Sequence, residues 1–81
     1  MLPYKEKAIC LYNLGRYLEA LAVLEKATAV QSTYDEGYYW AGRCYEKIND
    51  TKSAIASYEL ALQIDPDYED AQDALSKLGV K

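Results

Sequence analysis

The sequence predicts an all-α protein of 81 residues, a solenoid of stacked helical hairpins with five helices. Three observations lead to this prediction. Apolar residues recur at the three-and-four spacing of helical faces, turn residues separate these stretches, and the two halves of the chain match each other. A chain this short buries only about 60 % of its unfolded surface, so we expect one domain, residues 1–81.

The clearest hairpin lies between Tyr38 and Pro66. Its first helix carries one small or apolar face, made of Tyr38, Ala41, Gly42, Tyr45 and Ile48. After the turn pair Asn49-Asp50, which also offers an N-cap, a second helix runs to Asp65-Pro66 and has the equivalent face Ala54, Ile55, Tyr58, Ala61 and Leu62. So short a connection makes the helices antiparallel, and Gly42, Ala54 and Ala61 are small enough for their backbones to approach closely.

A looser hairpin precedes it. Pro3 suits the first turn of a helix that ends at Gly15, and the apolar stripe of this helix comprises Tyr4, Ala8, Leu11 and Leu14. A second helix begins at Tyr17 and continues to about Val30. Because Leu18 and Val23 leave it apolar nearly all round, we expect it to have neighbours on two sides.

The two hairpins are related by a shift of 34 residues without a gap. This shift superimposes identical residues at seven positions of the first half, namely Tyr4, Cys10, Ala20, Ala22, Glu25, Ala27 and Tyr34. The match predicts two structural repeats, residues 1–34 and 35–68. A further helix, within residues 67–79 and capped by Asp67, has a narrow apolar line and a polar opposite side, as the terminal element of a solenoid requires.

The period and spacing resemble those of the tetratricopeptide repeat (TPR) family. In the second repeat, the residues that stand where the family has W, L, G, Y, A, F, A and P are Tyr38, Ala41, Gly42, Tyr45, Ala54, Tyr58, Ala61 and Pro66. The first repeat departs from the pattern at Lys7 and Ser32. The resemblance covers essentially the whole chain and implies a right-handed superhelix, whose concave surface is lined by the first helix of each repeat.

That surface is the candidate binding site. If the apolar faces point inward, Glu36, Trp40, Arg43 and Lys47 line the opposite side of their helix, with Tyr39 and Glu46 at its margins. The resemblance adds equivalent positions from the other helices. The predicted peptide- or partner-binding residues are Lys5, Ile9, Tyr12, Asn13, Glu36, Tyr39, Trp40, Arg43, Lys47, Asp73 and Lys77. Aromatic residues surrounded by charges are typical of protein interfaces.

Plainer explanations stay open for several of these residues. Trp40 could fold over Arg43 or Tyr12 and only shield the groove, and Ile9 could simply pack beneath Tyr12. Arg43 and Lys47 could form ion pairs with the glutamates of their own helix.

One known use of TPR grooves is to clamp the C-terminal carboxylate of chaperones. Lys5 stands at one clamp position, but Ile9, Trp40, Asp70 and Ala74 replace the amide and basic residues at the others. The resemblance therefore disfavours an acidic chaperone tail as the ligand.

Composition excludes other classes of function. The net charge of −4 argues against nucleic-acid binding, and no uncharged run exceeds eight residues, so we expect no membrane segment. Without histidine, a phosphate loop or a cysteine beside a base, we expect neither catalysis nor a metal or other cofactor. Cys10 and Cys44 are expected in the core, with a disulfide or redox role as the alternative. No secretory signal is visible, and this favours the cytosol.

The sequence thus predicts a protein–protein interaction module with a peptide or protein ligand that its residues do not identify. The alternative is an assembly element. In that case the first repeat, which has no cap, would pack on a second copy or on missing upstream repeats through Leu2, Leu18 and Val23. A third possibility is that the repeats are a stabilising appendage of an enzyme.

Overall fold

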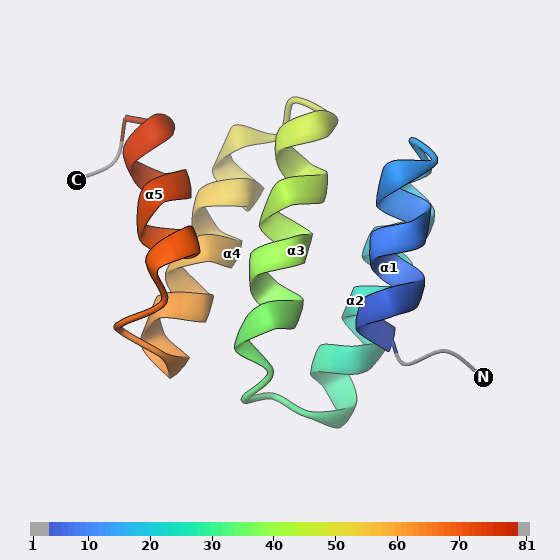
Figure 1. Cartoon of the computed structure of the whole chain (residues 1–81), viewed down its shortest axis with the longest axis horizontal. Helices are drawn as coiled ribbons and strands as arrows, with labels where there is room; N and C mark the ends of the chain where they lie inside the picture. Colours follow the sequence, from blue (N-terminus) through green and yellow to red (C-terminus); the bar gives the residue numbers. More distant parts are fainter. Residues whose placement is uncertain (1–3, 80–81) are drawn as a thin grey trace.

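The computed structural model describes residues 4–79 and consists of five helices, with no strand among these residues. The helices are α1 (Tyr4–Asn13), α2 (Tyr17–Val30), α3 (Asp35–Lys47), α4 (Thr51–Ile64) and α5 (Glu69–Lys77). Figure 1 shows them side by side in chain order, with α1, α3 and α5 in front and α2 and α4 behind. Consecutive helices pack on each other, and α1 also contacts α3. The predicted all-α hairpin solenoid is confirmed.

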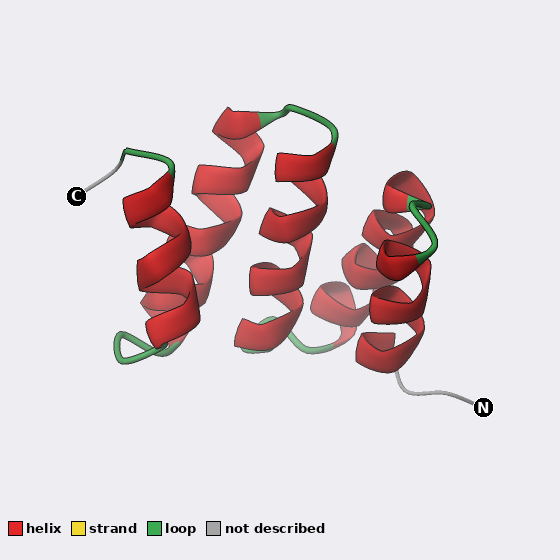
Figure 2. Cartoon of the chain, turned by 45° about the horizontal axis from the view of Figure 1, so that its top comes forward, coloured by secondary structure: helices red, strands yellow, loops and turns green. Residues whose placement is uncertain are grey.

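Short turns join the helices at alternate ends of the structure (Figure 2). Gly15, with φ of 79°, lies in the turn after α1, as the sequence predicts. Asp50 is the N-cap of α4, and its carboxylate accepts a hydrogen bond from the Ser53 N–H at 3.3 Å. Asp65 follows the last residue of α4, again as predicted. These ends depend on local backbone chemistry, which the sequence displays directly.

The sequence predicts helix starts at Asp67 and at Pro3. Asp67 is not the cap of the last helix, because Tyr68 occupies the N-cap position of α5 without a side-chain hydrogen bond to the helix. Asp67 instead belongs to the preceding turn, where its N–H donates to the Asp65 carboxylate at 3.1 Å. The predicted start at Pro3 lies outside the described residues.

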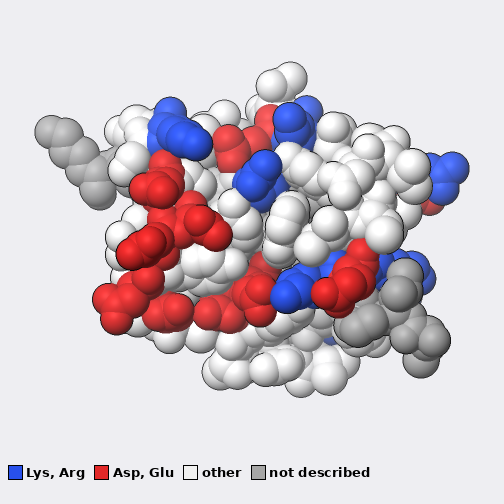
Figure 3. Space-filling model, in the orientation of Figure 1, with Lys and Arg blue, Asp and Glu red and all other residues white. Residues whose placement is uncertain are grey.

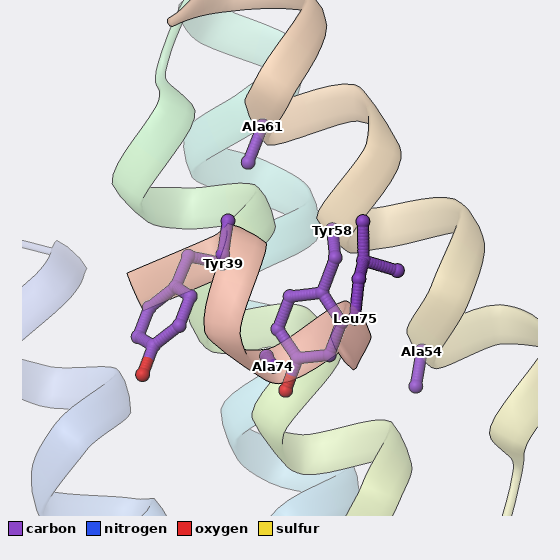
Figure 4. Packing of buried hydrophobic residues seen from close by; sticks show 7 residues of the cluster. Tyr39, Ala54, Tyr58, Ala61, Ala74 and Leu75 are labelled. Atoms are coloured by element: carbon purple, nitrogen blue, oxygen red, sulfur yellow. The ribbon is translucent and has the colours of Figure 1, made fainter. Parts of the chain in front are cut away.

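The core consists of two clusters. The first lies between α1, α2 and α3 and contains Ala8, Ala20, Leu21, Leu24 and Cys44. The second lies between α3, α4 and α5 and contains Tyr39, Ala54, Tyr58, Ala61, Ala71, Ala74 and Leu75; Figure 4 shows part of it. The half-buried side chains of Trp40 and Tyr45 pack against both clusters and join them.

Gly42 brings α3 and α4 into close contact. A Cβ atom at this position would lie 2.6 Å from the Tyr58 ring, which is completely buried. Ala54 and Ala61 on the facing helix are also completely buried. The predicted inward positions of Gly42, Ala54 and Ala61 are therefore correct.

The apolar stripe predicted for the first helix is only partly buried. Ala8 is buried, but Tyr4 is 47 % exposed, and Leu14 is 70 % exposed because it lies in the turn beyond the end of α1. In the second repeat, Ile48 follows α3 and is 37 % exposed, so its predicted inward position is also wrong.

Leu18 is 71 % exposed, whereas Val23 is half-buried. The expectation that α2 has neighbours on two sides is confirmed, because α2 packs on both α1 and α3. Leu18 does not take part, since no described helix packs on that part of the surface of α2.

The cysteines behave differently from each other. Cys44 is 1 % exposed and packs on residues of the first hairpin, and burial raises the pKa of its thiol to about 11. Cys10 occupies the equivalent position of the first repeat, yet it is exposed. A core position for Cys10 was therefore the wrong prediction: no described helix covers α1 as the first hairpin covers α3. Both thiols are free.

Candidate protein-binding groove

A groove of about 390 Å³ lies on the face formed by α1, α3 and α5. Its lining includes six of the predicted binding residues, Tyr12, Tyr39, Arg43, Lys47, Asp73 and Lys77. Three further lining residues, Glu46, Asp70 and Ala74, are not in the predicted set. The structure thus brings together side chains from both repeats and the last helix, and we call this feature the groove.

The helical spacing explains the three additional residues. Glu46 lies one turn after Arg43 on α3, and Asp70 and Ala74 lie one turn before Asp73 and Lys77 respectively, so each adjoins a predicted residue. All three could have been predicted from this spacing in the sequence. Glu46 was already assigned to the margin of the surface, and Asp70 and Ala74 were already compared with clamp positions.

Five predicted residues lie outside the groove lining. The ammonium group of Lys5 forms an ion pair with the Glu36 carboxylate at 2.8 Å, which links α1 to α3. The hydrogen bond with Glu36, together with the negative charge of that carboxylate, raises the pKa of Lys5. Ile9 is half-buried, and Asn13 is exposed at the end of α1.

Trp40 is half-buried beside the groove. Its ring makes edge-to-face contacts with the Tyr12 and Tyr39 rings, with 5.6 Å between centroids in both pairs. Because Trp40 also packs on both core clusters, it stabilises the contact between the two repeats. The contacts with Tyr12 and Arg43 match the shielding position considered for this residue.

Tyr39 is more buried than its predicted position at the margin suggests. Only 8 % of the residue is exposed, and its ring stacks on that of Tyr68 at 5.3 Å. Its hydroxyl accepts a hydrogen bond from Arg43 at 2.8 Å. Tyr39 thus contributes its ring to the core and lines the groove as well.

Arg43 is held in place by aromatic side chains of both repeats. Its guanidinium carbon lies 5.5 Å from the ring centroids of Tyr12 and Trp40 and 5.8 Å from that of Tyr39. It donates hydrogen bonds to the hydroxyls of Tyr39 at 2.8 Å and Tyr12 at 3.2 Å. The ion pairs with glutamates of α3 that we considered for Arg43 and Lys47 do not form in the described residues.

The Glu46 side chain is hydrogen-bonded to a residue of the core. The buried Tyr58 hydroxyl donates a hydrogen bond to its carboxylate. Burial and this hydrogen bond raise the pKa of Tyr58, so its hydroxyl stays protonated at neutral pH. The bond fixes one acidic side chain at the groove wall.

The two walls of the groove differ in net charge. Figure 3 shows acidic side chains gathered over α5, with basic side chains over the middle of the face. Among the lining residues, Arg43, Lys47 and Glu46 come from α3, and Asp70, Asp73 and Lys77 come from α5. The α3 wall thus has a net charge of +1 and the α5 wall a net charge of −1.

Residues 4–79 contain no group of three or more histidine, cysteine or acidic side chains that could hold a metal ion. Within that range, no helix is both long and apolar enough to cross a membrane.

Comparison with known proteins decides the family. The family model described as tetratricopeptide repeat matches residues 6–69, which is most of the chain. The chain belongs to the tetratricopeptide repeat family. Its five helices correspond to two such repeats followed by a capping helix. TPR domains are protein–protein interaction modules in general, and this chain is one of them.

Two curated TPR relatives are similar over most of this chain. The Hsp70-Hsp90 organizing protein of Triticum aestivum is 32 % identical over 73 residues, which are 90 % of this chain and 13 % of the relative. The Hsp70-Hsp90 organising protein of Plasmodium falciparum is 33 % identical over 66 residues, which are 82 % of this chain and 26 % of the relative. The TPR chain thus spans at most about a quarter of these relatives.

Proposed function

We propose that this TPR domain binds an extended segment of a partner protein in the groove between α1, α3 and α5. The observation that supports the proposal most strongly is the fixed arrangement of Tyr12, Arg43 and Tyr39 at the groove lining. Side chains that are already ordered lose little conformational entropy when a ligand binds. The groove also combines aromatic and charged groups, which are common at the centres of interfaces.

The names of the relatives suggest chaperones as partners, but the residues here do not favour a chaperone tail. Lys5, at the one matching clamp position, is ion-paired with Glu36. Asp70 and Ala74 line the groove where the clamp would place basic side chains. We therefore propose a ligand other than a strongly acidic C-terminal tail. The cytosolic location expected from the sequence stays a prediction.

A binding experiment with matched variants tests the groove. The whole chain is used to select twelve-residue segments from a random display library, and affinities are measured by fluorescence anisotropy. We expect Lys47→Glu, in the groove on α3, to weaken binding. Lys52→Glu, an equal charge change at an exposed position of α4, should not. Equal effects of the two variants, or no selected segment, would count against the groove.

Self-association is a second candidate function, favoured by exposed apolar side chains at one end of the first hairpin. Leu14 and Leu18 are 70 % and 71 % exposed there. Leu2, which the sequence also suggested, lies outside the described residues. Sedimentation velocity over a hundredfold range of concentration tests this function. A monomer at every concentration would refute it, while dimers abolished by Leu18→Ser would support it.

A further inference from the structure

The Arg43 guanidinium is a cationic group with a fixed position in the groove lining. It has five N–H donors, and in the described residues two of them bond to the Tyr12 and Tyr39 hydroxyls. These acceptors are neutral, and no described carboxylate pairs with Arg43. By contrast, Lys5 and Arg16 each have a glutamate partner. Arg43 thus combines a fixed position with a positive charge that the protein itself does not neutralise by an ion pair.

The surroundings of Arg43 make this charge available on one side. The rings of Tyr12, Tyr39 and Trp40 contact the guanidinium. Arg43 also lines the groove. Burial acts to lower the pKa of Arg43, but the two tyrosine hydroxyls act to raise it, and the net pKa is raised. Arg43 is therefore cationic at every pH at which the protein would be studied.

The opposite wall has a net negative charge. Asp70 and Asp73 on α5 line the same groove, and both are exposed; Lys77, one turn after Asp73, offsets one of the two negative charges. They attract a basic side chain and repel a second carboxylate. A ligand with acidic groups along its whole length would thus be attracted at Arg43 and repelled at Asp70 and Asp73.

We propose that the groove selects an internal segment of mixed charge, in which an acidic side chain binds Arg43 and a nearby basic side chain faces Asp70 and Asp73. This specificity rests on the proposed function of the groove. A carboxylate has two oxygens that match the planar fork of a guanidinium, so Arg43 can bind it through two parallel hydrogen bonds. Tyr12 and Tyr39 then act as positioning residues for Arg43.

The first experiment identifies the preferred charges. A display library of random twelve-residue segments, flanked by chain at both ends so that no segment has a free C-terminus, is selected with the whole protein. The proposal predicts enrichment of one Asp or Glu and one Lys or Arg at a constant spacing. Selection of segments without an acidic residue would overturn the proposal but leave groove binding intact. Failure to select any segment would overturn both.

The second experiment changes each side of the proposed ion pair. Exchange of the segment's acidic residue for its amide should weaken binding about 10- to 100-fold, as expected for a charge-assisted hydrogen bond. Arg43→Gln should give a similar loss, and a double-mutant cycle between the two changes should show that the losses are not additive. Arg43→Lys keeps the charge without the fork and should recover only part of the affinity.

Lys52→Gln, at an exposed position of α4, is the matched control for loss of one positive charge. Circular dichroism checks that each variant is folded, and the segment's amide variant needs no change in the protein. Additive losses in the cycle would overturn the pairing with Arg43.

The third experiment tests the anionic wall and the source of the carboxylate. Exchange of the segment's basic residue for Glu should weaken binding to the wild type, and Asp73→Lys should restore it. Without such restoration, the assignment of the basic residue to α5 would be wrong. The selected segment is also prepared with its acidic residue replaced by Asn and a free C-terminus. Full affinity of this peptide would show that a terminal carboxylate is the true ligand, which would overturn the proposal.

Discussion

The contact between Gly42 and Tyr58 gives a sharp prediction about the packing of α3 on α4. In Gly42→Ala, the new Cβ would lie 2.6 Å from one ring atom of Tyr58 and 2.8 Å from two others. The ring is completely buried and its hydroxyl is bonded to Glu46, so it cannot turn away easily. Overpacking of this kind costs up to about 3 kcal/mol, while alanine gains about 1 kcal/mol over glycine in a helix. We therefore expect Gly42→Ala to destabilise the protein by about 2 kcal/mol.

The assay is urea unfolding followed by circular dichroism, with thermal unfolding as a second measure. For a domain of this size, a loss of about 2 kcal/mol lowers the melting temperature by roughly 8–16 °C. Ala56→Gly, at an exposed position in the middle of α4, is the control for helix propensity and should cost about 1 kcal/mol.

A double-mutant cycle separates the clash from other effects. In a Tyr58→Leu background the clashing ring is absent, so Gly42→Ala should be neutral or stabilising there, with a coupling energy of about 2 kcal/mol. If Gly42→Ala stabilised the wild type instead, the close packing of α3 on α4 would be refuted.

Three further predictions concern a helix cap and the cysteines. Asp50→Ala should destabilise the protein by about 1 kcal/mol in urea unfolding, because the Ser53 N–H loses its acceptor, whereas Asp50→Asn should retain most of the stability. Cys10 should react rapidly with an aromatic disulfide reagent and Cys44 slowly, because only Cys10 is exposed; two equal rates would contradict the packing of Cys44. The raised pKa of the Cys44 thiol contributes to the free energy of unfolding. This contribution is complete below pH 9.0 and is lost as the pH rises towards about 11. Because the unfolded state releases this proton first, stability should fall by up to about 1.4 kcal/mol per pH unit in that range, and this component should be absent in Cys44→Ala.

The sequence predicts the helix ends and the inward small residues well because these features depend on local chemistry. Gly15 has the positive φ that glycine tolerates, and Asp50 caps the helix that follows it. Gly42 is recognisable because the repeat pattern requires a small residue between two helices. Each of these signals lies within a few residues of the feature that it predicts.

The burial of individual side chains depends on neighbours that a single helix does not reveal. Cys10 and Cys44 have equivalent sequence contexts, but among the described residues a hairpin packs against Cys44 and none packs against Cys10. Tyr38 and Tyr39 lie on adjoining parts of α3, and contact with Tyr68 and the α4–α5 cluster makes Tyr39 the more buried of the two. Contacts between repeats therefore decide what the periodic pattern leaves open.

The candidate site was predictable as a surface but not in its detailed contacts. Helical periodicity assigned Arg43 to the free side of α3, where it lines the groove. Its hydrogen bonds to Tyr12 and Tyr39 join two repeats, so they depend on how α1 packs against α3. The same holds for the ion pair between Lys5 and Glu36.

The groove as the binding surface is the central claim, and amide chemical shifts measured during titration test it most directly. The titrant is a display-selected segment, added to uniformly nitrogen-labelled protein. The account predicts that the largest shift changes occur at the groove lining on α1, α3 and α5. Changes confined to the exposed surfaces of α2 and α4 would contradict it.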